Sequence, residues 1–108
     1  MTDNDKVPEL SVEEFDNFVK KGVVFVDFFA DWCMPCMMMG PIVDELSERF
    51  RKKIKFAKVN VGEEQDLALK FNVNSIPAFK VFKNGKVVEE FGGGMSAEEL
   101  EAKLKNHI

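Results

Sequence analysis

The two cysteines of the chain, Cys33 and Cys36, lie three residues apart in the segment "WCMPC", and the chain has no others. Such a pair, placed between a buried strand and the start of a helix, indicates a thiol-disulfide redox centre, because helix geometry brings residues three apart within bonding reach. A zinc site needs four ligands, and His107 is the one histidine available. A structural disulfide across so short a loop would add little stability. The pattern therefore favours redox chemistry over both alternatives.

The position of each cysteine predicts its role. Cys33 falls where the helix begins, so its sulfur faces unpaired backbone N–H groups and the positive end of the helix dipole, which favour the thiolate. Cys36 falls inside the first turn, where neighbouring groups cover it. We therefore expect Cys33 to attack a disulfide and Cys36 to resolve the mixed disulfide that forms. Pro35 suits the first turn of any helix.

The elements that must position this pair follow from hydrophobic periodicity. The run "VVFVDFFA" predicts a strand over 23–30 that is buried on both faces, and the apolar spacing that follows predicts a long helix from the cysteines to about residue 51. Capping boxes at Ser11 and Ser96 predict a first and a last helix, and Asn84-Gly85 predicts a hairpin. With a strand over 54–61 and a short helix within 63–73, the order βαβαββα predicts an α/β fold with a mixed sheet, an antiparallel edge and helices on both faces.

Composition narrows the function classes. A chain of 108 residues with 45% hydrophobic content predicts a single domain over 1–108 with a core of its own. The net charge of −4, with no basic run, argues against nucleic acid as a partner. The acidic start of the chain lacks the pattern of a secretory signal, and no apolar run is long enough to span a membrane. We therefore expect a cytoplasmic protein with no membrane partner, and in that compartment a cysteine pair is more often catalytic or metal-binding than structural.

Four segments, "VDFFADWCMPC", "SIPA", "FKNGK" and "GGG", occur in the order and at the spacing typical of the thioredoxin family. The chain resembles this family from about Leu10 to Leu104. The resemblance implies a thioredoxin-like three-layer sandwich and a general protein-disulfide reductase that uses a reversible Cys33–Cys36 disulfide. It also implies protein disulfides as substrates, a thioredoxin reductase as partner, a monomer, and a reaction without a metal or an organic cofactor.

The resemblance further implies that Asp27 lies beneath the cysteines and exchanges a proton with Cys36 through water. The residues around Asp27 are apolar, so burial should favour its neutral form and raise its pKa. The alternative is an aspartate that faces solvent near the end of the strand. Lys58 matches the family's lysine beside this aspartate; from the sequence alone it could equally be a strand lysine that extends its charge into solvent.

The expected substrate-binding residues surround the cysteines. By resemblance, Ile76-Pro77 is a cis-proline site at which the backbone of Ile76 binds an extended substrate, although sequence alone favours a trans bond. Trp32 is expected to form an apolar wall of the site, unless it is simply part of the core. Gly92 and Gly93 either let a partner's backbone approach or form a flexible loop. The full expected set is Trp32, Met34, Pro35, Ile76, Pro77, Gly92 and Gly93.

The methionines around the cysteines depart from the family pattern. Met34 stands where the family usually has a small residue, so the redox potential of the pair cannot be carried over from the family. Residues 37–39 are all methionine where a lysine commonly follows the second cysteine, which could widen an apolar docking patch around Cys33. The alternative is that at least Met38 and Met39 pack in the core.

Two other functions remain open from the sequence. A disulfide oxidase or isomerase would use the same cysteines with a less reducing pair. A binding or scaffold protein of the same fold would carry the cysteines incidentally, because fold does not fix function.

Overall fold

Four strands form one mixed sheet in the order β2-β1-β3-β4 in the computed structural model, which describes residues 7–108. The strands are β1 (Val23–Phe29), β2 (Ile54–Asn60), β3 (Ala78–Lys83) and β4 (Lys86–Gly92). β1 pairs with β2 in parallel and with β3 antiparallel, and β3 pairs antiparallel with β4. The predicted mixed sheet with an antiparallel edge is confirmed.

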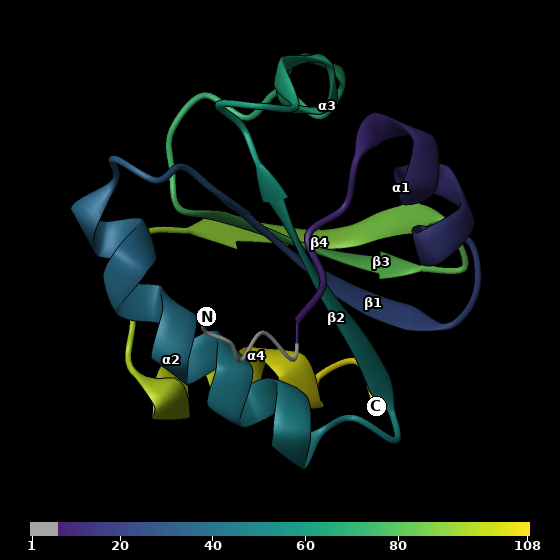
Figure 1. Ribbon diagram of the computed structural model, residues 1–108. Helices are drawn as coiled ribbons and strands as arrows, with labels where there is room; N and C mark the ends of the chain where they lie inside the picture. The colour runs from purple at the N-terminus through teal and green to yellow at the C-terminus, as the bar shows by residue number, and fades with distance from the viewer. Residues whose placement is uncertain (1–6) are drawn as a thin grey trace.

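The helices cover both faces of this sheet, as Figure 1 shows. They are α1 (Val12–Val19), α2 (Met34–Arg49), α3 (Gln65–Lys70) and α4 (Ala97–Lys105). α2 and α4 pack on one face, where Leu46 and Leu100 belong to the same buried cluster. α1 and α3 pack on the other face, where Phe15 and Leu67 share a second cluster. The three-layer arrangement is therefore as predicted.

The central strand β1 is buried on both faces because its side chains alternate between the two clusters. Val24, Val26 and Phe28 pack under α1 and α3, whereas Phe25 packs under α2 and α4. The same alternation places Asp27 on the α2 side of the sheet. β1 ends just before the cysteines, so a rigid strand leads directly into the site.

Local sequence signals fix the ends of several elements. Ser96 caps α4: its hydroxyl accepts the N–H of Glu99, and the Glu99 carboxylate accepts the N–H of Ser96. Asn84 and Gly85 both have positive φ, at 51° and 87°, as a tight hairpin between β3 and β4 requires. The predicted cap at Ser96 and the hairpin are confirmed, and Ser11 is the N-cap of α1, with its N–H donating to the Glu14 carboxylate.

The phase of α2 corrects one prediction about the core. Met39 is buried together with Cys36 and Val43, which lie three residues before it and four after it. Met38 is one position out of this phase and leaves 69% of its surface exposed. Core packing therefore holds for Met39 and is wrong for Met38.

Candidate active site

Cys33 and Cys36 are joined by a disulfide at the start of α2, with their Cα atoms 5.2 Å apart. Cys33 is the N-cap of the helix, and its Sγ accepts the backbone N–H of Cys36 at 3.2 Å. The sulfur thus takes the place that a serine or aspartate oxygen usually fills at a helix start. An N–H donor and the positive end of the helix dipole both favour negative charge on this sulfur when the pair is reduced.

The backbone on both sides holds the cysteine loop in place. The N–H of Cys33 donates to the carbonyl of Ala30 at 3.2 Å, and the carbonyl of Cys33 accepts the N–H of Met37 at 3.1 Å. Both cysteines are buried in a small apolar cluster with Phe29 and Ala30, against which Ile76 also packs. Ala30, directly after β1, therefore holds Cys33 from one side, and the first turn of α2 holds it from the other.

Asp27 is almost completely buried, with 3% of its surface exposed, so the alternative of a solvent-facing aspartate is wrong. Burial raises the pKa of its carboxyl to about 7; the charge of Lys58 opposes this rise and that of Asp44 adds to it. Its Oδ1 accepts no hydrogen bond from residues 7–108. A carboxyl with such a pKa can change its protonation state near neutral pH.

Lys58 lies opposite Asp27 in the register of β2 and β1. Its side chain is half-buried, with Nζ 5.7 Å from the centre of the Phe29 ring. Its backbone also holds the start of the described chain, because its N–H donates to Pro8 and its carbonyl accepts from Leu10. Lys58 is therefore the neighbour of Asp27 that the resemblance implies.

The Ile76–Pro77 peptide bond is cis, as the resemblance implies and as sequence alone did not favour. Gly93 donates its N–H to the carbonyl of Pro77 at 3.0 Å. A Cβ on Gly92 would come within 2.8 Å of the same carbonyl oxygen. The absence of a side chain at Gly92 therefore already serves a contact within the chain, in addition to any approach by a partner.

Trp32 is not part of the core, because 78% of its surface is exposed. It lines a hollow of about 350 Å³ together with Ile76 and residues of α3 that include Leu69. Met34 and Pro35, in the first turn of α2, are exposed as well. The structure thus brings Trp32 and Ile76 together beside Cys33, with Met34 and Pro35 adjoining Cys33 in the chain.

Asn60 was not among the predicted site residues, yet it anchors the loop before the cysteines. It is buried at the end of β2, where its Oδ1 accepts the N–H of Gly62 at 2.9 Å and its Nδ2 donates to Asp31 at 3.4 Å. A polar residue at the end of a buried strand is the sequence signal that could have identified it.

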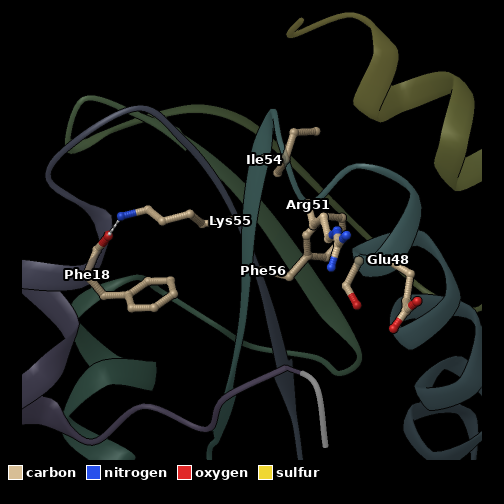
Figure 2. Close-up of a pocket in the computed structure, with 7 residues that line it drawn as sticks. Phe18, Glu48, Arg51, Ile54, Lys55 and Phe56 are labelled. Carbon is tan, nitrogen blue, oxygen red and sulfur yellow. Dashed lines mark hydrogen bonds between the residues drawn. The ribbon is translucent and has the colours of Figure 1, made fainter.

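A second hollow, of about 370 Å³, lies beside β2 (Figure 2). Lys55 lines it and donates from Nζ to the carbonyl of Phe18 at 2.7 Å, and Arg51 and Glu48 lie across β2 from Phe18. None of the predicted site residues lines this hollow. It is therefore separate from the cysteine site.

Within residues 7–108, no cluster of three or more histidine, cysteine, aspartate or glutamate side chains is arranged to hold a metal ion. None of the helices in that part of the chain is long and apolar enough to cross a membrane. The prediction about a secretory signal rests largely on the first six residues, which lie outside those that the structure describes.

Comparison with known proteins tests the resemblance directly. The thioredoxin family model matches residues 6–106. Thioredoxin from Bacillus subtilis is 38% identical over 96 residues, which cover 89% of this chain and 92% of the relative. Thioredoxin 2 from Chlorobaculum tepidum is 41% identical over 86 residues, covering 80% of this chain and 79% of the relative. The family model spans the strands, the helices and the cysteine pair together. With the two relatives, it shows that the chain belongs to the thioredoxin family and is a protein-disulfide reductase that acts by thiol-disulfide exchange.

Proposed function

We propose that Cys33 is the attacking nucleophile of this reductase and Cys36 the resolving thiol. The Cys33 thiolate attacks one sulfur of a substrate disulfide, a mixed disulfide forms, and the other substrate sulfur leaves as a thiolate. Cys36, once deprotonated, then attacks the Cys33 sulfur and releases the second substrate sulfur. The substrate gains two electrons, and the enzyme is left with the Cys33–Cys36 disulfide.

The observation that carries this assignment is the N-cap position of Cys33. Its sulfur accepts the N–H of Cys36 and lies at the positive end of α2. Cys36 lies inside the first turn and does not have this position. Because the thiolate is the reactive form, the sulfur with the donor is the better first nucleophile.

Asp27 is proposed as the proton acceptor and donor for Cys36, acting through water. It lies on the sheet face that α2 covers, and its pKa of about 7 allows it to accept a proton near neutral pH. Lys58 is proposed to act on the reaction through Asp27, because its positive charge limits how far burial raises the pKa of that carboxyl.

The substrate is proposed to bind as an extended segment beside Cys33. Ile76 offers its backbone next to the cis-proline Pro77, and Trp32 forms the wall of the adjoining hollow. Met34 and Pro35 follow Cys33 directly in the chain. Gly92 and Gly93 are proposed to keep the backbone on the other side of Pro77 accessible, consistent with the exposure of both.

The family supports protein disulfides as substrates and a reductase that restores the dithiol. We propose that this partner is a thioredoxin reductase, which allows each protein molecule to reduce substrates in many turnovers. We further propose that the protein works as a monomer in the cytoplasm. The proposed machinery comes from one sheet and its helices, which supports one domain over the chain.

Two serine variants test the order of attack. Cys36→Ser should retain an attacking thiol and accumulate a mixed disulfide with the substrate, because no second thiol can resolve it. Cys33→Ser should form far less of this adduct and lose disulfide reduction. Mass spectrometry of the adducts, with insulin as substrate, distinguishes the two variants. Equal adduct formation by both would contradict the assignment.

A further inference from the structure

The exposed face of the first half of α2 carries a continuous apolar strip. Met34, Met37, Met38 and Pro41, named here the methionine strip, follow one another at i, i+3, i+4 and i+7 and so lie on one side of the helix. The exposed fractions of the three methionines are 70%, 43% and 69%, and Pro41 is exposed too. The opposite side of the helix supplies the buried Cys36, Met39 and Val43.

Charged side chains are absent from this segment of the chain. From Trp32 to Val43 the chain has no lysine, arginine, aspartate or glutamate, although 31% of the whole chain is charged. A helix face turned to solvent usually carries charged side chains. A contiguous exposed apolar surface is typical of a contact site.

The strip is continuous with the reaction centre. It begins at Met34, the residue after the proposed nucleophile Cys33, and extends along α2. The hollow formed by Trp32 and Leu69 adjoins the cysteine cluster, because Ile76 and Val61 line the hollow and also pack against that cluster. The residues lining that hollow are uncharged as well. A protein disulfide that reaches Cys33 would therefore meet apolar surface in two places.

We propose that the methionine strip is a second docking surface, and that it selects protein disulfides whose cysteine is flanked by large apolar side chains in an extended or unfolded segment. Methionine side chains are long, flexible and polarisable, so they can pack against apolar groups of different shape. A strip of methionine side chains offers no ion pair to charged flanks and only weak hydrogen-bond acceptors to polar flanks. This inference rests on the proposed role of Cys33, because the strip can act on a substrate only while Cys33 is bonded to it or close to it.

The experiment uses two synthetic disulfide peptides of equal length and zero net charge. One carries leucine and phenylalanine on both sides of the cysteine, and the other carries serine and threonine. For each enzyme variant, kcat/KM with each peptide is divided by kcat/KM of the same variant with a small uncharged disulfide. Changes in the reactivity of Cys33 then cancel. The measured quantity is the ratio of the normalised kcat/KM for the apolar peptide to that for the polar peptide.

The test variant is Met37→Gln with Met38→Gln, which keeps side-chain length and charge while making both positions polar. The expected ratio is about tenfold lower than in the wild type, equivalent to about 1.4 kcal/mol. Met37→Leu with Met38→Leu should keep the wild-type ratio. Val88→Gln, on the exposed surface of β4, is the matched control and should leave the ratio unchanged.

Three results would overturn the inference. They are a ratio that changes less than twofold in the glutamine variant, an equal fall in the Val88→Gln control, and a strip occupied by a second copy of the chain. Light scattering across the assay concentrations detects the last case. If Cys33→Ser still reduced both peptides, the proposed function would fail instead, so the two failures are distinguishable.

Discussion

Replacing Asp27 by asparagine should change how the stability of the protein depends on pH. In the folded protein, burial raises the pKa of this carboxyl to about 7, against an ordinary value of 3.8. The folded state therefore holds a proton on Asp27 between about pH 4 and pH 7, where the unfolded chain has lost it. Stability must fall as pH rises through this window and level off above it.

The size of the effect follows from the same two values. At about 1.4 kcal/mol for each pH unit, the interval between 3.8 and about 7 corresponds to about 4 kcal/mol of unfolding free energy. Asp27→Asn cannot ionise and loses this term. Its stability relative to the wild type should therefore rise by about 4 kcal/mol between pH 4 and pH 8.

The assay is urea unfolding of the oxidised proteins, followed by circular dichroism at several pH values. Oxidation removes titration of the cysteines, and circular dichroism avoids dependence on Trp32, which is already exposed in the folded state. Groups such as Glu14 titrate in both proteins, so their contribution cancels in the difference. Asp66→Asn, at an exposed site in α3, is the matched control for the same chemical change outside the core.

A stability difference between Asp27→Asn and the wild type that stays constant from pH 4 to pH 8 would show that burial does not raise the pKa of Asp27. It would mean that the carboxyl is hydrated in the folded protein and titrates as an ordinary aspartate. A difference of the opposite sign would mean that the charged form is stabilised, against the dominant effect of burial.

Three further predictions concern stability, each measured by urea unfolding at pH 7. Gly92→Ala should lose about 1–3 kcal/mol because the new Cβ would meet the carbonyl oxygen of Pro77, whereas Gly94→Ala, with open space around it, should lose much less; equal losses would contradict the close approach. Asn60→Ala should lose about 1–3 kcal/mol because a backbone N–H loses its acceptor, and an unchanged midpoint would argue against this anchor. Ser96→Ala should lose about 1 kcal/mol with the cap of α4, and no loss would mean that water replaces the hydroxyl.

Local signals in the sequence predicted most of the elements. The Ser96 cap and the Asn84-Gly85 turn act through contacts within a few residues, so their types and spacing suffice. The apolar run around Asp27 predicted both a central strand and a buried carboxyl, because a strand covered on both faces leaves no side exposed.

Features that depend on contacts between distant segments could not be predicted in this way. A lysine in a sequence is expected to have a solvent-exposed side chain. Lys80 is nevertheless buried in β3, and its Nζ lies 2.6 Å from the Glu90 carboxylate on β4. The contact between Gly92 and the Pro77 carbonyl requires the pairing of β3 with β4. Met38 points outward because packing of α2 on the sheet sets the phase of its buried face.

The proposed chemistry depends on one property of the reduced protein, the ready ionisation of Cys33 at the start of α2. The most direct measurement is the rate of alkylation by iodoacetamide against pH in the Cys36→Ser variant, in which Cys33 is the only thiol. Rapid alkylation at neutral pH is expected, with the midpoint of the profile well below about 8.5, the pKa of an unperturbed cysteine. A midpoint at or above that value would contradict this expectation.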